Sequence, residues 1–379
     1  MAGPLNGLKV VELAGLAPAP FATTVLADLG ADVVRVDRAK PGFDVLAFPN
    51  DPLSRGRRWI GVDTKSPEGR DVVLRLVDDA DVLVEGFRPG VTERLGIGPD
   101  VCLERNPRLI YGRVTGWGQD GPLAQAAGHD INYIGLAGAL EPIGRAGERP
   151  VPPLNLLGDF GGGGLLLAMG VLAALVERGV SGRGQVVDAS MVDGSALLTA
   201  GLHGLRNLGM WGAGRGRNML DGGAPFYDTY EASDGRYVAV GAIEERFWAA
   251  LLKVMEIDPA EVSGRLDPAQ WPQVREKLAA VFATRTRDEW AELAAGTDAC
   301  LTAVLSPEEA PAHPHNVARG TFVALDGHTQ PAPAPKFDRT PAGTPAPPHE
   351  PRSDTSAVLA VLGYAPEDIE RMRAEGVIA

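Results

Sequence analysis

Short apolar runs alternate with amphipathic stretches along the first half of the chain. Four runs rich in Val, Ile and Leu predict buried strands, at residues 8–15, 31–38, 81–87 and 108–118. Two amphipathic stretches predict helices, at residues 18–30 and 66–80. Gly30 is placed to close the first helix, and Ser66 and Pro67 are placed to begin the second. Because strands and helices alternate, we expect a parallel sheet with crossover helices, and therefore an α/β fold.

The pattern changes in the second half of the chain. A Gly-rich turn at 158–164 leads into a long apolar helix, and residues 185–198 repeat the order of strand and helix. From residue 227 an alternating pattern around Asp234-Gly235 predicts a hairpin, which indicates a smaller α+β domain. The remaining predicted features are amphipathic helices at 244–255 and 286–295, a Pro-rich connector at 329–351 and terminal helices at 355–379.

Composition limits the class of protein and its compartment. The chain has 379 residues, enough for two domains, and its formal net charge of −13 disfavours nucleic-acid binding. Its two cysteines, Cys102 and Cys300, form neither a disulfide framework nor a zinc signature, so a cytoplasmic location is expected. The N-terminus lacks a signal-peptide pattern, and the apolar run at 165–176 is too short to span a bilayer. We therefore expect no membrane partner.

A nucleotide site is the first functional candidate. The dinucleotide fingerprint needs G-x-G-x-x-G after the first strand, whereas residues 14–21 read AGLAPAPF, which disfavours a nicotinamide oxidoreductase. Arginines nevertheless gather at predicted strand ends and loops, where parallel sheets bind ligands and where the planar guanidinium suits phosphate. They are Arg38, Arg55, Arg57, Arg58, Arg88 and Arg94. A phosphate-bearing ligand and an ordinary solvated surface both remain open for this set.

Two titratable residues in Gly-rich settings are candidates for proton transfer. His129 stands in AAGHDINYIGLAGAL and is suited to act as a general base, because imidazole ionises near neutral pH; the alternative is a structural loop residue. Asp159 is placed to cap the long helix, whose end would favour a negatively charged oxygen. The glycines after it would let a ligand approach the backbone, or would simply permit tight packing. The sequence alone does not bring His129 and Asp159 together.

Long motifs in a fixed order give a resemblance. The chain contains, in this order, PLNGLKVVELAGLAPAPFATTVLADLGADVVRVDR, VDTKSPEG, GFRPGVTERLGIGPD, LIYGRVTGWGQDGP, AGHDINYIGLAGAL, PPLNLLGDFGGGG and DGGAPFYDTYEASDGRYVAVGAIEERFW. It closely resembles the α-methylacyl-CoA racemases of the family III CoA-transferase superfamily, from about residue 3 to the Pro-rich connector. The resemblance implies the family III CoA-transferase fold, with a Rossmann-like large domain, a smaller α+β domain and two chains interlocked as a homodimer.

The resemblance also implies roles for individual residues. His129 and Asp159 match the two proton-transfer groups, and Asp159 is the acyl nucleophile in related transferases. Glu244 matches a residue that supports the histidine from the partner subunit, and Asp130 is expected to fix the loop. The residues implied for binding of the CoA moiety are Arg38, Val62, Asp63, Thr64, Lys65, Gly86, Phe87, Arg88, Pro89, Gly90, Arg94, Gly128, Asp130, Ile131, Asn132 and Tyr133.

The activity implied is epimerisation of 2-methylacyl-CoA thioesters at the α-carbon, by an isomerase of lipid and fatty-acid metabolism. One base removes the α-proton, the enolate is stabilised, and the other base returns a proton on the opposite face. No metal and no cofactor beyond the CoA moiety of the substrate are expected. The alternatives are a CoA-transferase that works through an aspartyl intermediate and a non-catalytic CoA-binding protein.

The expected division of the chain follows from the same comparison of motifs. A large CoA-binding domain spans 1–188 and is completed by 332–379. The expected parts between them are linker helices at 189–226, a small α+β domain at 227–312 and a return linker at 313–331.

Overall fold

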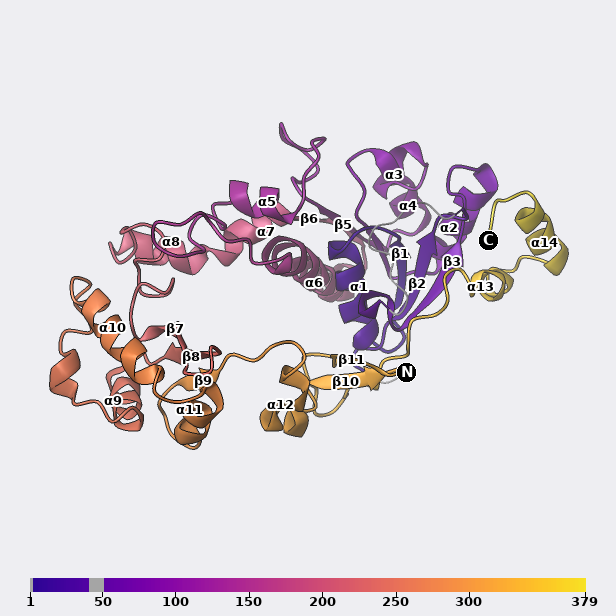
Figure 1. Ribbon diagram of the computed structural model, residues 1–379. Coiled ribbons are helices and arrows are strands. Elements are labelled where there is room, and N and C mark those ends of the chain that lie inside the picture. Colours follow the sequence, from indigo (N-terminus) through magenta and orange to yellow (C-terminus); the bar gives the residue numbers. More distant parts are fainter. Residues whose placement is uncertain (1–2, 41–50) are drawn as a thin grey trace. The chain divides into compact units, whose positions relative to one another are not determined.

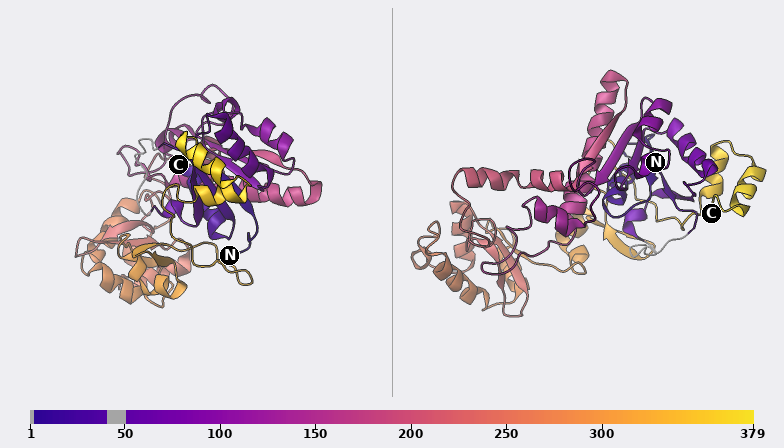
Figure 2. Two further views of the ribbon diagram at one scale, coloured as in Figure 1. Left: turned by 90° about the vertical axis from the view of Figure 1, so that its right-hand side faces the viewer. Right: turned by 90° about the horizontal axis from the view of Figure 1, so that it is seen from above.

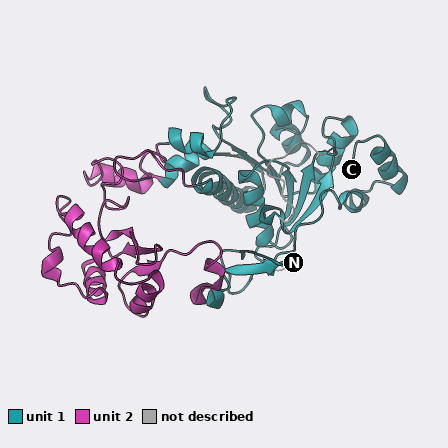
Figure 3. Ribbon diagram, viewed as in Figure 1, with its two compact units in different colours: residues 1–137, 154–198, 317–379 teal, residues 138–153, 199–316 magenta. Residues whose placement is uncertain are grey.

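The computed structural model describes residues 3–40 and 51–379. Their contacts divide the chain into two compact units, shown in Figure 3. The first unit comprises residues 1–137, 154–198 and 317–379, and the second comprises 138–153 and 199–316. The first unit therefore resumes at 317, earlier than the expected residue 332. Part of the expected return linker is thus tied to the first unit, where Arg55 donates hydrogen bonds to the side chain of Gln330 at 2.8 Å and to the carbonyl of Pro331 at 2.7 Å.

A six-stranded parallel sheet forms the centre of the first unit (Figure 1). Its strands are β1 (Lys9–Leu13), β2 (Asp32–Asp37), β3 (Arg57–Gly61), β4 (Val82–Glu85), β5 (Ile110–Thr115) and β6 (Gln185–Ser190). Their order is β3-β2-β1-β4-β5-β6, so the direction of winding reverses between β1 and β4. Sheets of this kind bind ligands at the carboxyl ends of the strands near that reversal. The loops after β1 to β4 are therefore the expected place for a site.

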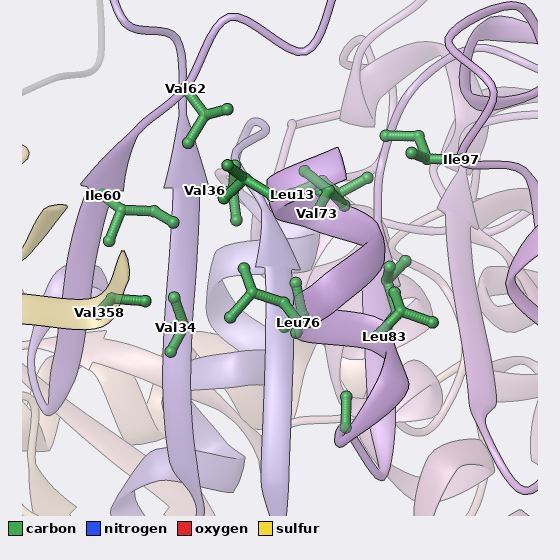
Figure 4. Close-up of a cluster of buried hydrophobic side chains, with 14 of the residues drawn as sticks. Leu13, Val34, Val36, Ile60, Val62, Val73, Leu76, Leu83, Ile97 and Val358 are labelled. Carbon is green, nitrogen blue, oxygen red and sulfur yellow. The ribbon is translucent and has the colours of Figure 1, made fainter. Parts of the chain in front are cut away.

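Helices cover both faces of this sheet, and Figures 1 and 2 show the layers. Alternate strand residues point to opposite faces, so Val10 packs with α1 (Pro18–Asp28) and α6 (Leu166–Ser181), whereas Val11 packs with α2 (Pro67–Asp78). Figure 4 shows the cluster on the α2 side, where Leu76 lies among strand residues. Parallel sheets need such two-sided cover because both faces are apolar.

Local signals explain where several helices begin and end. The predicted start of α2 is confirmed, because Ser66 Oγ accepts a hydrogen bond from the N–H of Gly69 at 3.0 Å and Pro67 is the first helical residue. Gly30, just after α1, has φ of +102°, which a residue with a Cβ rarely adopts. The other helices of the first unit are η1 (Pro52–Ser54), α3 (Val91–Arg94), α4 (Pro99–Arg105), α5 (Asp130–Leu136) and α7 (Met191–Leu198). The next helix, α8 (Ala200–Asn207), belongs to the second unit.

The long apolar helix begins earlier than the sequence suggests. A π-helical segment, η2 (Leu156–Leu165), runs directly into α6, and the N–H of Phe160 donates to the carbonyl of Asn155 at 3.3 Å. The prediction that Asp159 caps this helix is therefore wrong, because Asn155 precedes the helix and Asp159 lies in its first turn. The Gly run does not interrupt the helix, because α1 and α7 pack against this segment.

This continuous helix also revises the expectation that the apolar run at 165–176 is too short to span a bilayer. The 26 residues Leu156–Ser181 are long and apolar enough to cross a membrane, by length and composition alone. A core helix of a globular unit passes the same test. Leu167, Ala168, Val171 and Ala174 are buried in the cluster that joins α6 to the sheet. We therefore interpret this helix as part of the core of the first unit.

The second unit is an α+β unit, as predicted. Its antiparallel sheet has the order β7-β8-β9, and Asp234-Gly235 forms the predicted turn between β7 and β8. Trp248, Phe282 and Trp290 are buried in its core. Its elements are β7 (Tyr227–Glu231), β8 (Tyr237–Gly241), α9 (Glu245–Val254), η3 (Pro259–Val262), α10 (Trp271–Phe282), α11 (Arg287–Ala294), β9 (Leu301–Ala303) and η4 (Ala310–Ala312).

The last part of the chain returns to the first unit. It consists of α12 (Pro314–Arg319), an antiparallel pair β10 (Phe322–Leu325) and β11 (His328–Pro331), and the predicted terminal helices α13 (Thr355–Val361) and α14 (Pro366–Ala374). Both terminal helices contribute buried side chains to the cluster on the α2 face of the sheet.

Candidate active site

His129 lies immediately before α5, in the segment that follows β5. Its N–H donates to Asn132 Oδ1 at 3.0 Å, and the N–H of Asn132 donates to the carbonyl of His129 at 2.8 Å. This reciprocal pair fixes the backbone of His129, while the side chain is exposed. The imidazole can therefore meet a ligand from solvent without breaking a structural contact of its backbone.

Asp159 is a half-buried carboxyl group in the first turn of η2. Its Oδ2 accepts a hydrogen bond from Asn155 Nδ2 at 3.2 Å. Burial raises the pKa of Asp159, the hydrogen bond from Asn155 opposes that rise, the charge of Asp130 adds to it, and the charge of His129 opposes it. A raised pKa brings a carboxyl group closer to the range in which it both accepts and returns protons efficiently.

Asp130 connects the segment of His129 to that of Asp159. Its buried carboxylate accepts, through Oδ2, a hydrogen bond from the backbone N–H of Asp159 at 2.7 Å. Gly158 makes room for this contact, because a Cβ there would lie 2.5 Å from the same oxygen. Since a hydrogen bond to an ionised acceptor is stronger than a neutral one, Asp130 holds the two candidate bases in a fixed relation.

The Gly run after Asp159 serves packing. Glycines 162–164 are buried. A Cβ on Gly162 would lie 2.8 Å from the backbone nitrogen of Ser195 in α7, and one on Gly164 would lie 2.8 Å from the ring of Phe21 in α1. The idea that the run opens the backbone to a ligand is therefore wrong for these three positions. They let η2 approach α1 and α7 closely.

Tyr133 and Trp117 pack against each other beside this site. Their rings meet edge to face with centroids 4.8 Å apart, and the Tyr133 hydroxyl donates to the carbonyl of Gly128. Burial raises the pKa of Tyr133, the charge of Asp159 adds to the rise, and the charge of Arg88 opposes it. The loop after β4, which carries Arg88, therefore acts in the same electrostatic environment as the candidate bases.

Four cationic side chains near the carboxyl ends of the strands have no ion pair with any residue among 3–40 and 51–379. Arg38 follows β2, Lys65 follows β3, and Arg88 and Arg94 follow β4. All four residues are exposed. In a chain with an excess of acidic residues, unpaired cations at one edge of a sheet suit a ligand that carries phosphates.

Three other arginines that the sequence places at strand ends and loops stabilise the fold instead. Arg55, Arg57 and Arg58 each form an ion pair within the first unit. Arg57 is buried and binds the buried carboxylate of Glu12, and Arg58 binds both carboxylate oxygens of Asp32, at 2.8 and 2.7 Å. The hypothesis that these three hold a phosphate is therefore wrong, because their charges are already neutralised by carboxylates.

A buried ion pair shapes the loop that carries Arg88. Glu85, at the end of β4, accepts hydrogen bonds from the N–H of Phe87 and from Arg113 Nε, both at 2.7 Å. Arg113 also binds Glu93 of α3 at 2.9 Å. Burial raises the pKa of Glu85, and Arg113 opposes that rise. Sequence reasoning missed this pair, as it missed Asn155, because each partner looks like an ordinary polar residue until the register is known.

Glu244 belongs to the second unit, whereas His129 and Asp159 belong to the first. Its side chain is exposed, and its carbonyl accepts hydrogen bonds from the N–H groups of Phe247 and Trp248, at 3.1 and 2.9 Å, as α9 begins. The other residues expected around CoA lie in the loops after β3 and β4 and beside His129; they are Val62, Asp63, Thr64, Gly86, Phe87, Pro89, Gly90, Gly128, Ile131 and Asn132.

The sequence and the fold are both similar to those of known proteins. The sequence matches CoA-transferase family III over residues 5–355. It is 48% identical over 379 residues to the alpha-methylacyl-CoA racemase of Mus musculus, covering 99% of this chain and 97% of that protein. It is 46% identical over 377 residues to the protein of the same name from Homo sapiens, with coverage of 99% and 97%. The crystal structure of a CAIB/BAIF family protein from Brucella suis matches with a TM-score of 0.80 and 27% identity, covering 96% of this chain and 100% of that one.

Proposed function

The chain belongs to CoA-transferase family III, and we propose that it is an isomerase that epimerises 2-methylacyl-CoA thioesters at the α-carbon. Relatives named alpha-methylacyl-CoA racemase, at 46–48% identity over nearly all of both chains, support this activity. The observation that carries it in the structure is the 2.7 Å hydrogen bond from the N–H of Asp159 to Asp130, the residue next to His129, because it joins the segments of the two candidate bases. Such substrates belong to lipid and fatty-acid metabolism.

Two bases divide the chemistry. One of them, His129 or Asp159 according to the epimer bound, takes the α-proton, and the electrons of the broken C–H bond move into an enolate of the thioester. The other residue, protonated beforehand, gives its proton to the opposite face of the same carbon, so that the configuration inverts. Each turnover leaves the two groups with exchanged protonation states, and the raised pKa of Asp159 favours this exchange.

The enolate oxygen needs positive charge nearby. The N–H of Asp159 already donates to Asp130, so it does not serve that oxygen. The start of η2 at Leu156 lies before Asp159 and carries the partial positive charge of a helix N-terminus. We assign electrostatic stabilisation of the enolate to this helix end. The CoA phosphates are assigned to Arg38, Lys65, Arg88 and Arg94, which follow the strands and are unpaired among the described residues.

A homodimer in which Glu244 of one chain supports His129 of the other is part of the proposal. Four apolar side chains of the long helix, at spacings that place them on one face, are 48–90% exposed: Leu165, Met169, Val176 and Val180. Exposed apolar side chains that share one face of a helix are typical of a contact surface. We also propose a cytoplasmic location, which the two unpaired thiols of Cys102 and Cys300 support.

The test uses one pure epimer of a 2-methylacyl-CoA in deuterated water. We expect both epimers to appear, with deuterium at the α-carbon. His129→Ala and Asp159→Ala should each lower epimerisation by about 10²- to 10⁴-fold, and each should retain slow exchange from one epimer only, opposite in the two variants. Transfer of CoA to a free carboxylic acid, with the α-hydrogen retained, would instead show a CoA-transferase that uses Asp159 as nucleophile.

A further inference from the structure

The C-terminal residues fold back onto strand β3, although residues 356–379 lie beyond the part of the chain that matches the family. β3 is an edge strand of the sheet. The N–H of Trp59 donates to Asp354 Oδ2 at 2.7 Å, and the N–H of Gly61 donates to Thr355 Oγ1 at 3.0 Å. In Figures 1 and 2 helix α13 lies beside β3. The tail therefore satisfies backbone groups that an edge strand would otherwise leave unpaired.

The same tail continues to the carboxyl end of β3, where the loop that carries Lys65, one of the cations assigned to the CoA phosphates, begins. The N–H of Asp63 donates to the carbonyl of Val377 at 2.7 Å, and the N–H of Ala379 donates to the carbonyl of Gly61 at 3.1 Å. Val62 and Ile378 form the β-bridge between these two bonds. The turn that follows, which carries Thr64 and Lys65, thus starts from a backbone held by the tail.

Arg352 makes the corresponding contact with the loop after β2. Its Nε donates to the carbonyl of Arg38 at 2.8 Å, and its guanidinium lies 3.9 Å from the carboxylate of Asp37. Its backbone has φ of +66°, a region that residues with a Cβ occupy rarely and only where the surroundings hold them. Gly61 leaves room for it, because a Cβ there would lie 2.7 Å from Arg352 Cδ.

Burial anchors these contacts to the core. Val377 and Ile378 are 9% and 2% exposed and belong to the same cluster as Val36 and Val62 at the ends of β2 and β3. Figure 4 shows Val358 of α13 beside Ile60 and Val34 in that cluster. A close-packed anchor of this kind transmits a fixed position to the backbone that it supports.

We propose that Arg352 together with residues 377–379, here called the C-terminal clamp, positions the nucleotide end of the acyl-CoA site. The clamp holds the backbone at Arg38 from one side and at Asp63, two residues before Lys65, from the other. It therefore sets the separation of two cations that the proposed function assigns to phosphates. The ligand class it serves is the phosphorylated adenosine part of CoA, which is the same for every acyl chain.

The clamp rests on the proposed function, and it predicts a specific change in the kinetic constants. A residue that positions phosphate ligands affects the bound ground state and the transition state alike, so its loss raises KM and leaves kcat nearly unchanged. An edge-strand cover that is only structural would lower the free energy of unfolding without changing the affinity of the folded protein for CoA. Affinity for CoA itself, which has no acyl group, separates the two roles.

The experiment measures the Kd of CoA by calorimetry, and KM and kcat of epimerisation, in the full chain and four variants. Arg352→Ala should raise the Kd of CoA and the KM about tenfold, with kcat within about twofold. Arg352→Gln should restore most of the affinity, because its amide nitrogen takes the place of Nε and can still donate to the carbonyl of Arg38. The matched control is Arg373→Ala, since Arg373 binds Glu370 and Ser356 within the tail itself, and it should leave the Kd unchanged.

The fourth variant ends after Gly376 and removes the backbone partner of Asp63. It should bind CoA weakly if folded, as circular dichroism and the unfolding transition would show; if it does not fold, the two Arg352 variants decide. An unchanged Kd in Arg352→Ala would overturn the clamp. So would an Arg352→Gln variant that binds CoA as weakly as Arg352→Ala, because the charge of Arg352 would then be acting directly on a CoA phosphate. A wild-type chain that binds CoA but does not epimerise would refute the proposed function and leave the clamp intact.

Discussion

The contact between Gly194 of α7 and Gly162 of η2 allows a sharp test of how the candidate base is held. A Cβ on Gly194 would lie 1.9 Å from the carbonyl oxygen of Gly162, whereas ordinary contacts begin at 3.4 Å. In Gly194→Ala the two helices must therefore separate by about 1.5 Å, the difference between these distances. Asp159 lies three residues before Gly162 in the same helix, so it must move with that backbone.

The expected magnitudes follow from this overlap. Forcing a methyl group into a packed contact costs about 1–3 kcal/mol, and the better helix propensity of Ala offsets up to about 1 kcal/mol of that. We expect the free energy of unfolding to fall by about 1–2 kcal/mol. A displacement of about 1 Å at a catalytic group can cost about 100-fold in rate, so kcat/KM should fall much further than stability alone would suggest.

Urea unfolding and steady-state epimerisation measure the two effects. Gly179→Ala is the matched control, because Gly179 lies in α6, which is continuous with the helix of Asp159, and nothing lies within 4 Å of the added Cβ. The control should raise the free energy of unfolding by about 0.5–1 kcal/mol and leave kcat/KM unchanged. If Gly194→Ala were as stable and as active as the parent chain, close packing of the Gly run would not be what positions Asp159.

Three further predictions concern charge and assembly. Arg94→Ala should raise the KM for acyl-CoA with little change in kcat and stability. Arg57→Ala should instead lower the free energy of unfolding by about 3 kcal/mol, because buried Glu12 loses the nearer of its two arginines and keeps Arg35 at 3.4 Å; equal effects in the two variants would contradict the division between free and structural arginines. Asp130→Asn removes a charge that raises the pKa of Asp159, so the acidic limb of the pH–rate profile should move to lower pH for the epimer that Asp159 deprotonates, and an unmoved limb for both epimers would show that the two groups are not coupled. Sedimentation at assay concentrations should show a dimer, and a fully active monomer would exclude the role of Glu244 across subunits.

Much of the fold can be predicted from the sequence because its signals are local. Ser66 and Pro67 begin α2 as expected, since the capping hydrogen bond and the fixed φ of proline need only neighbouring residues. The Asp234-Gly235 turn and the apolar strands are predicted for the same reason. The relatives show the racemase class that the long motifs indicate.

What the sequence could not supply depends on partners distant in the chain. Asp159 looks like a helix cap, but the helix extends back to Leu156 because its glycines pack between α1 and α7. Arg57 looks as free as Arg88, but the register of β1, β2 and β3 brings Glu12 to it inside the core. In both cases a local pattern was overruled by tertiary contacts that no short window of sequence contains.

The attachment of the tail to β3 has a consequence for how the protein is made. Trp59 and Asp354 are 295 positions apart, so the outer edge of β3 stays open until nearly the whole chain has been translated. At about 5–20 residues per second, the ribosome needs about 15–60 s to cover that interval. During this time the nascent chain presents an unpaired strand edge, which can associate with other chains. We therefore expect the yield of newly synthesised protein to rise with added chaperones or at a lower growth temperature. The stability of the finished molecule should depend much less on either.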